Sequence, residues 1–304
     1  MSDSFKATNF LGHEAFRIER EGLAAIALPS LGGRVVALLI EGHDVFWQDP
    51  RLAESAEARA AMPRPIWWGG WKTWLAPQSR WKNGAPSRDL DEGVWRYDIP
   101  TDAASGAWVL RMTSPVDSET GLEVVREVSL VPERLAVRVR VTLTNRAAAA
   151  PVEAGIWEVI QLKKPGQVAF PVDRSQFTDE MGVRTYEAEQ DSRAARLKHM
   201  RTLDDAAGRH AEVRCSGNLR FKYGARTPPK LGRIRAVMPE RGKRAVKLLF
   251  EAPAGARYAH EANVEVFNSN EAPYFEIEAH APLATLEPGA SATADFILEA
   301  QGPK

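Results

Sequence analysis

The sequence of 304 residues predicts an all-β fold, and three observations support this prediction. Apolar and polar residues alternate strictly from Leu135 to Thr144, which is typical of an antiparallel strand with one buried and one exposed face. Short β-rich segments recur along nearly the whole chain, and clusters of Gly, Pro, Asn and Asp separate them. Helical patterns are few. We therefore expect one large sandwich or barrel, a single domain over residues 1–304.

The expected strands are rich in β-branched and aromatic residues and lie between turn signals. They cover residues 24–29, 30–42, 108–114, 122–131, 134–145, 153–162, 245–252, 263–268, 274–283 and 292–300. Two further segments have helical patterns. Residues 49–62 are rich in Ala and Glu after an Asp-Pro start, and residues 192–203 carry apolar side chains at helical spacing. We expect both to be short additions to a β framework.

The charge balance argues against two classes of partner. The 40 basic residues cancel the 40 acidic residues, so nothing in the overall charge favours nucleic acid or an anionic membrane.

Cys215 is the only cysteine, which excludes an intramolecular disulfide and a thiolate metal cluster. The N-terminal residues lack the apolar region of a secretory signal, and no apolar run approaches membrane-spanning length. A cytoplasmic protein is the simplest interpretation, and a secreted protein that has lost its leader is the alternative.

Residues 67–81, WWGGWKTWLAPQSRW, contain five of the nine tryptophans. Their companions Lys72, Gln78 and Arg80 would need polar partners if the segment were buried, and Gly69–Gly70 permits a sharp turn or a close backbone approach. Indole faces beside polar groups suit a sugar ring, which has apolar C–H faces and a belt of hydroxyls. The alternative is that these indoles fill the core. The tryptophans that we expect to form a ligand-facing wall are Trp68, Trp71, Trp74 and Trp81.

The strand expected at 274–283 carries two carboxylates on one face. Glu276 and Glu278 lie at i and i+2, about 6.5–7 Å apart at their Cα atoms. Such a pair can raise one pKa, as general acid–base chemistry requires. The alternative is a strand face exposed to solvent, where glutamate is common.

Two other strands are candidate walls of the same site. In residues 263–268, Glu265 shares a face with aromatic and polar neighbours, and the alternative is that this face is exposed to solvent. In residues 153–162, Trp157 and Gln161 share one face, and Glu158 lies among apolar residues on the other. The alternative for the second strand is a core position where Glu158 pairs with an arginine.

Motifs for metals and common cofactors are missing from the sequence. The six histidines show neither HxH nor HExxH spacing, so we expect no metal ligand among them. The sequence also lacks a nucleophile elbow, a phosphate-binding loop with its lysine, and a dinucleotide-binding GxGxxG. We expect no metal and no cofactor.

Several segments together resemble the galactose-mutarotase-like superfamily, which includes the aldose 1-epimerases. They are LPSLGGRVVALLIEGHDVFW, WGGWKTWLAPQSRW with LDEGVW after it, SPVDSETGLEVVREVSL and YFEIEAHAPLATLEPGAS. The resemblance runs from about Thr8 to Leu298. Within the superfamily, the sequence is most similar to an uncharacterised family whose members carry a GGxxxWxxPQxxW pattern. It implies a large antiparallel β-supersandwich with a few short helices and a concave, sugar-binding face.

The resemblance also implies a chemistry. Aldose 1-epimerases use a late-strand glutamate as the general base, which resembles Glu276 or Glu278 here, with Glu276 preferred. Their acid is a histidine on a middle strand, and Trp157 stands at the matching position. Trp68 matches a second histidine, before the Gly-Gly pair. Because an indole N–H does not give up its proton near neutral pH, the acid would have to be replaced. Candidate replacements are Lys72, Glu158 and Arg80, and Lys72 would need a lowered pKa to act in this way.

These observations leave three hypotheses. The first is an epimerase-like enzyme acting on an aldose or uronic acid with an altered acid. The second is a sugar-binding or sensor module without turnover. The third is a structural or interaction domain whose tryptophans are core, and burial of the indoles would discriminate it from the other two.

Overall fold

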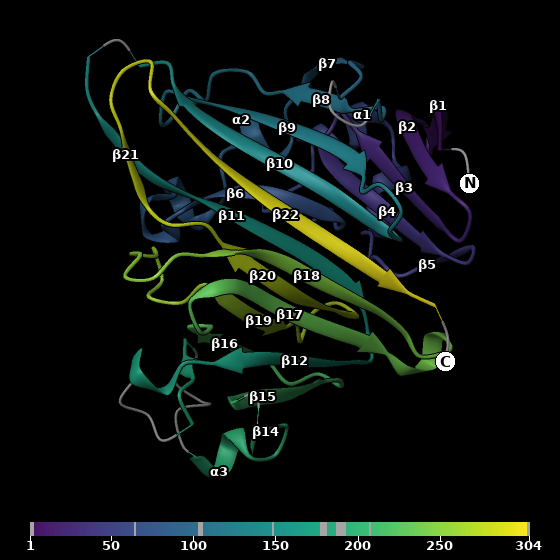
Figure 1. The fold of residues 1–304 in the computed structure, drawn as a ribbon. Coiled ribbons are helices and arrows are strands. Elements are labelled where there is room, and N and C mark those ends of the chain that lie inside the picture. The colour runs from purple at the N-terminus through teal and green to yellow at the C-terminus, as the bar shows by residue number, and fades with distance from the viewer. Residues whose placement is uncertain are drawn as a thin grey trace.

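Two large antiparallel β-sheets pack face to face, as the sequence predicts (Figure 1). The computed structural model describes residues 3–63, 65–102, 106–147, 149–176, 181–186, 193–206 and 208–302. Within these residues one sheet has 12 strands and the other has 10. Figure 1 looks onto the ten-stranded sheet, so the outer face of the larger sheet points away from the viewer.

The 12-stranded sheet contains strands from both ends of the chain. Its order is β1 (Ser4–Phe10), β2 (His13–Arg20), β3 (Leu23–Leu28), β4 (Arg34–Ile40), β6 (Trp71–Ala76), β11 (Val152–Lys163), β20 (Tyr274–His280), β19 (Val264–Asn268), β16 (Phe221–Ala225) and β13 (Arg184–Thr185). Two short strands lie off this path. They are β5 (His43–Asp44), which pairs with β4, and β21 (Ala284–Leu286), which pairs with β11.

The ten-stranded sheet is the front layer of Figure 1. Its order is β14 (Met200–Asp205), β15 (Gly208–Cys215), β12 (Gly166–Val172), β17 (Lys230–Met238), β18 (Arg244–Ala252), β22 (Ser291–Gln301), β10 (Ala136–Asn145), β9 (Leu122–Leu130), β8 (Leu110–Thr113) and β7 (Arg96–Asp98). Short helices lie between strands: α1 (Ala56–Ala60), α2 (Arg88–Asp91), α3 (Arg193–Arg196), and 3₁₀ turns at Pro50–Ala53, Gln78–Arg80, Lys82–Gly84, Arg174–Gln176 and Pro239–Arg241. Among the described residues, no helix has the length and apolar character needed to cross a membrane.

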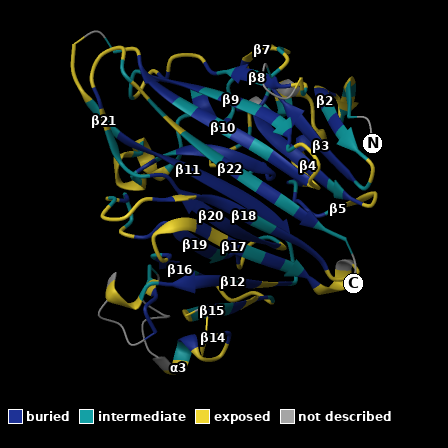
Figure 2. Ribbon diagram, in the orientation of Figure 1, coloured by how far each residue is buried: buried dark blue, intermediate teal, exposed yellow. Residues whose placement is uncertain are grey.

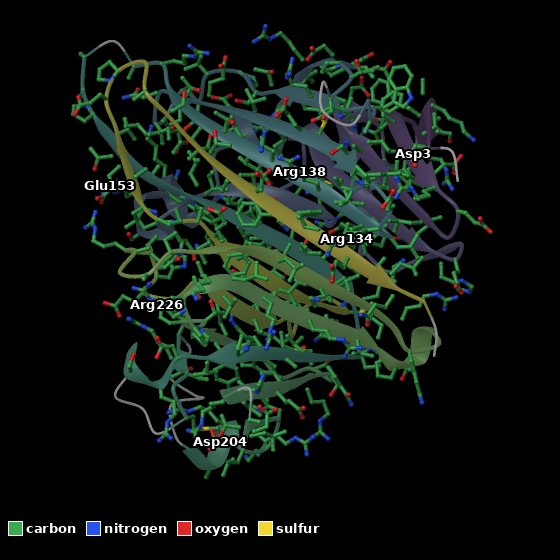
Figure 3. The ribbon with its side chains drawn as sticks, viewed as in Figure 1. Asp3, Arg134, Arg138, Glu153, Asp204 and Arg226 are labelled. Atoms are coloured by element: carbon green, nitrogen blue, oxygen red, sulfur yellow. The ribbon has the colours of Figure 1, made fainter. Side chains whose placement is uncertain are left out.

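One apolar core fills the space between the sheets (Figure 2). β10 shows why: Val137, Val139 and Val141 are fully buried, whereas Arg138 lies on the outer face and pairs with Asp295 of β22 at 2.8 Å. Figure 3 shows Arg138 over the middle of the front sheet. The predicted alternation is confirmed from Val137 to Leu143 and fails at the two ends, where Leu135 is exposed and Ala136 and Thr144 are buried. The single-domain span 1–304 stays a prediction.

The two helical predictions had different outcomes. Residues 49–62 contain the 3₁₀ turn Pro50–Ala53 and α1, as predicted. In residues 192–203, residue 192 lies outside the described residues, and only Arg193–Arg196 is helical. From Met200 onward the chain is β14, so that part of the prediction is wrong. Pairing of β14 with β15 places Met200 opposite Val213 and buries it, and this tertiary contact outweighs the local helical spacing.

Candidate functional site

The outer face of the 12-stranded sheet carries a row of polar and aromatic side chains. On β20, Phe275, Ile277 and Ala279 point into the core between the sheets, so Glu276 and Glu278 point to the opposite face. The two-face alternation predicted for this strand is confirmed. Both glutamates are nevertheless buried rather than solvated.

Neighbouring strands contribute to the same face by the same alternation. The side chains opposite the core-facing residues of β6, β11 and β19 are Lys72, Trp74, Trp157, Val159, Gln161, Glu265 and Phe267. Strand register then brings them together across β11, β20 and β19. The cross-strand pairs are Trp157 with His280, Gln161 with Glu276, and Glu265 with Glu278.

Glu278 is fully buried and is bound from two sides. Trp157 Nε1 donates a hydrogen bond to Glu278 Oε2 at 2.8 Å, and Lys222 Nζ lies 3.0 Å from the same oxygen. Burial raises the pKa of Glu278 well above its usual range; Lys222 opposes this, and the charges of Glu265 and Glu276 reinforce it. Glu278 is therefore held as a structural hydrogen-bond partner of the Trp157 indole.

Glu265 is also fully buried, but it has the opposite electrostatic environment. Lys222 Nζ lies 2.9 Å from its Oε2, His260 Nδ1 lies 3.0 Å from its Oε1, and His280 Nε2 lies 3.2 Å from its Oε2. Burial alone would raise the pKa of Glu265, but Lys222 and His280 outweigh it and hold that pKa well below its usual range. Glu265 is an anion surrounded by nitrogen atoms.

Glu276 is the most accessible of the three carboxylates, with 8% of its side chain exposed. Gln161 Nε2 donates to Glu276 Oε1 at 2.8 Å, and Lys72 Nζ lies 4.0 Å from the same oxygen. Among the described residues, Lys72 Nζ makes no hydrogen bond, and it lies 4.6 Å from the centre of the Trp74 ring. Burial lowers the pKa of Lys72 to about 8; Glu276 opposes this and Arg34 adds to it. Burial raises the pKa of Glu276, which Lys72 partly offsets.

An aromatic cluster lies beside these groups. Trp74 meets Trp67 at 5.7 Å and Trp81 at 5.2 Å between ring centres, and Trp81 stacks on Trp157 at 5.5 Å. Trp74 Nε1 donates to Asp91 Oδ1 at 2.9 Å, which fixes the orientation of this indole. Trp67 and Trp81 remain partly exposed, so they form the outer rim of the cluster.

Trp71 and Trp68 do not join this wall. Trp71 begins β6 on the core side and is fully buried between the sheets. Gly69 and Gly70, both at positive φ (96° and 72°), turn the chain just before it. Trp68 is buried in a separate apolar cluster and donates from Nε1 to Glu92 Oε1 at 3.2 Å. Both indoles are core residues, so placing them in the wall was wrong.

Glu158 does not join the site either. It lies on the core-facing side of β11, accepts a hydrogen bond from Thr73, and pairs with Arg126 of the opposite sheet at 3.2 Å. The side chains of Glu158 and Arg126 are both fully buried. Glu158 is therefore a core residue paired with an arginine, as the alternative interpretation of this strand has it.

Arg80 and Gln78 lie at the edge of the aromatic cluster. The Arg80 guanidinium is bound to the Glu153 backbone oxygen and lies 3.3 Å from the Glu153 carboxylate, and Figure 3 shows Glu153 at the rim of the molecule. Arg80 therefore points away from Glu276. The Gln78 side chain is exposed, while its backbone N–H approaches His260 Nε2 at 3.4 Å.

Sequence reasoning missed Lys222, His260 and His280. His280 continues the face of Glu276 and Glu278 at the next even step along β20, so its position was readable from the alternation. Lys222 stands between buried Phe221 and Tyr223 on β16, which was not recognised as a strand. His260 lies in the connection before β19, where no local pattern indicates which way a side chain points.

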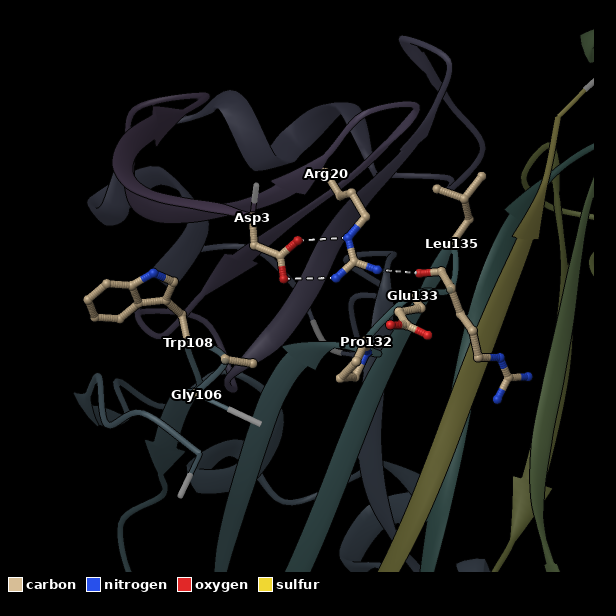
Figure 4. A pocket seen from close by; sticks show the side chains of 9 residues that line it. Asp3, Arg20, Gly106, Trp108, Pro132, Glu133 and Leu135 are labelled. Carbon is tan, nitrogen blue, oxygen red and sulfur yellow. Dashed lines mark hydrogen bonds and ion pairs between the residues drawn. The ribbon is translucent and has the colours of Figure 1, made fainter. Parts of the chain in front are cut away.

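A separate surface pocket lies far from these groups, near the first strand and the β9–β10 turn (Figure 4). It has a volume of about 610 Å³ and is lined by the exposed Trp108. Arg20 spans it, with nitrogen–oxygen distances of 2.7 and 2.8 Å to Asp3 and of 2.8 Å to the Val131 backbone oxygen. Arg20 and Asp3 thus bind one another, and the Arg134 guanidinium is paired with the Glu299 carboxylate of β22.

Comparison with known proteins confirms the fold. No family model matches the chain, and no curated protein sequence matches it. Among solved structures, a galactose mutarotase-like protein from Clostridium acetobutylicum has a TM-score of 0.61 at 12% identity, with 99% of each chain covered. A galactose mutarotase-like protein from Lactobacillus casei has a TM-score of 0.53 at 10% identity, covering 94% of this chain and 100% of that one. The chain has the galactose-mutarotase-like fold.

A third similar structure is larger. It is a TPR-domain containing protein from Parabacteroides distasonis, with a TM-score of 0.58 at 16% identity over 96% of this chain. The present chain spans 48% of that protein's length. At these sequence identities the similarity shows the fold alone.

Proposed function

We propose that the chain binds a sugar or sugar derivative beside Trp74, Trp81 and Trp157 and interconverts its anomers with Glu276 and Lys72. The observation that carries this proposal is the pairing of the two groups. The carboxyl of Glu276, whose pKa is raised, lies 4.0 Å from the ammonium of Lys72, whose pKa is lowered. Such opposed shifts suit an acid–base pair that works near neutral pH.

The reaction divides between the two residues as follows. The Glu276 carboxylate takes the proton of the anomeric hydroxyl, the bond from the anomeric carbon to the ring oxygen breaks, and the Lys72 ammonium gives a proton to that oxygen. The open form rotates about the bond to its carbonyl carbon. Ring closure then returns one proton to Lys72 and the other from Glu276 to the new anomeric hydroxyl. Lys72 thus replaces the histidine acid whose matching position is Trp157.

The surroundings support these roles. Gln161 holds one Glu276 oxygen at 2.8 Å and thereby orients the carboxylate. Lys72 Nζ is buried and has no hydrogen bond within the described residues, so a ligand oxygen that reaches it would meet unpaired N–H donors. The Trp81 ring, which lies beside Trp74 and remains partly exposed, offers an apolar face to the C–H groups of a sugar.

Binding without turnover is the second candidate, and one observation favours it. The Trp81 ring covers Trp157 at 5.5 Å, so a sugar ring that stacks on Trp157 has to displace Trp81. A protein of this kind would report ligand through movement of Trp81 and would leave the rate of anomer exchange unchanged.

One experiment separates the two candidates. Anomer exchange is measured by proton NMR across a panel of neutral aldoses and uronic acids, with tryptophan fluorescence recorded on the same samples. The enzyme candidate predicts exchange faster than in buffer, lost in Glu276→Gln and Lys72→Met but kept in the matched surface variants Glu251→Gln and Lys247→Met, whose side chains lie on β18 of the other sheet. Fluorescence quenching without exchange supports the binding candidate. If no sugar gives either faster exchange or fluorescence quenching, both candidate functions are contradicted.

A further inference from the structure

Three potential metal ligands converge at one end of the site. His260 comes from the connection before β19, Glu265 from β19, and His280 from the end of β20. One nitrogen or oxygen atom of each lies within 4.8 Å of the others. The spacing along the chain does not reveal this cluster, because strand pairing rather than a local motif brings the residues together.

The distances within the cluster suit a metal ion. His260 Nδ1 lies 3.0 Å from Glu265 Oε1, and His280 Nε2 lies 3.2 Å from Glu265 Oε2. Two ligands about 2.0–2.1 Å from a tetrahedral zinc ion are about 3.3–3.4 Å apart. Small side-chain rotations would therefore bring the three donor atoms to coordination distance.

His280 provides the second, independent observation. Its side chain is 1% exposed, and within the described residues neither ring nitrogen makes a hydrogen bond of good geometry. The ring is held in place by Trp157, which stacks on it at 5.2 Å, and by His260 at 4.8 Å. A buried, unpartnered imidazole costs stability unless something binds it. Its Nε2 is aimed at the carboxylate that would share the ion.

We infer that His260, Glu265 and His280 form a binding site for a divalent transition-metal ion, with zinc as the best-suited probe. Two imidazole nitrogens and one carboxylate oxygen are ligands that Zn²⁺ and its first-row neighbours accept, and three protein ligands leave a position open for another oxygen. The inference does not depend on the proposed sugar chemistry, since it concerns the protein alone.

Lys222 is the group that competes with the ion. Its ammonium lies 2.9 Å from Glu265 Oε2 and 3.0 Å from Glu278 Oε2, so on metal binding it can keep Glu278 while Glu265 turns to the ion. Coordination through His260 Nδ1 leaves the ring proton on Nε2 and gives up the 3.4 Å contact from the Gln78 N–H.

The test is a titration of chelator-treated full-length protein with Zn²⁺ by calorimetry, and with Co²⁺ by visible absorption. We expect one equivalent of metal to bind, with the absorption bands of Co²⁺ in a low-coordinate nitrogen–oxygen site. His280→Gln and Glu265→Gln should weaken binding by about tenfold or more. His43→Ala, which removes an exposed histidine, should bind like the wild type.

Lys222→Met keeps the test informative if a ligand variant does not fold. It removes the competing cation, so we expect it to bind Zn²⁺ more tightly than the wild type, with folding checked by circular dichroism. Absence of stoichiometric binding, or equal affinity in wild type, His280→Gln and Lys222→Met, overturns the inference. Because no sugar is present, these outcomes are independent of whether the proposed function holds.

Discussion

Lys72 Nζ of β6 lies 4.0 Å from Glu276 Oε1 of β20, on the same face of the sheet and across the intervening strand β11. The distance is too long for a hydrogen bond and short enough for a strong charge interaction in a buried setting. Lys72 is 2% exposed and has its pKa lowered to about 8, so burial outweighs the attraction of the carboxylate. A lysine held in this state weakens the fold, because its charged form is disfavoured by burial.

The first prediction concerns stability and pH. The folded-state pKa of Lys72, about 8, lies below its ordinary value of 10.5, so the unfolded chain holds this proton more tightly. The penalty is complete below pH 8 and disappears as pH rises toward 10.5. Lys72→Met should therefore stabilise the protein at pH 7 by at most about 3 kcal/mol, with the advantage shrinking by pH 10. Urea denaturation of both proteins at the two pH values measures the difference, and a constant difference would contradict the assignment.

The second prediction concerns the rate of anomer exchange. Glu276 must be ionised to act as base, and burial raises its pKa, so the rate should rise with pH above the ordinary range of a glutamate. It should fall above about pH 8, where Lys72 loses the proton that it donates. Glu276→Gln should lower the rate about 100-fold or more. NMR exchange rates from pH 5 to 10 provide the profile, and a falling limb that persists in Lys72→Met would exclude Lys72 as the acid.

Most of the fold was predictable because its signal is local. β10 alternates between buried and partly exposed residues from Val137 to Leu143, and the same period predicts the two faces of β11, β19 and β20. The strands that the pattern does not predict include β1, β2, β6, β12, β14, β15, β16 and β17. Of these, β14 and β16 are short and lie near one edge of their sheets, and their strand character comes from pairing with neighbours rather than from their own sequence.

The site was predictable only where the strand assignment was right. Residues 71–76 were read as a tryptophan-rich segment and not as β6. Had the strand been recognised, the three-residue spacing of Trp71 and Trp74 would have placed them on opposite faces. Glu158 was likewise known to face away from Trp157. Lys222 comes from β16, far from Glu265 in the chain, so only the strand order of the sheet brings it to Glu265. His260 lies only five residues before Glu265, but no local pattern in that connection indicates which way its side chain points.

The third prediction separates the wall from the core among the tryptophans. Trp81→Ala removes a partly exposed ring, so it should weaken sugar affinity about tenfold or more while costing little stability. Trp71→Ala empties a fully buried position between the sheets and should cost about 3–5 kcal/mol. Any folded Trp71→Ala protein should bind sugar nearly as well as the wild type. Fluorescence titration and urea denaturation measure the two effects, and equal losses of affinity would contradict this division.

The fourth prediction concerns the ion pair that joins the two sheets. Arg126 binds Glu158 at 3.2 Å and also donates to the backbone oxygens of Gly33 and Trp71 at 2.8 and 3.1 Å. Because both charges are fully buried, Glu158→Leu leaves the guanidinium without its counter-ion and should cost about 3–5 kcal/mol. The double variant Arg126→Met, Glu158→Leu removes both charges and should recover much of that loss. Urea denaturation of the single and double variants tests this, and strictly additive losses would mean that the pair is not coupled across the core.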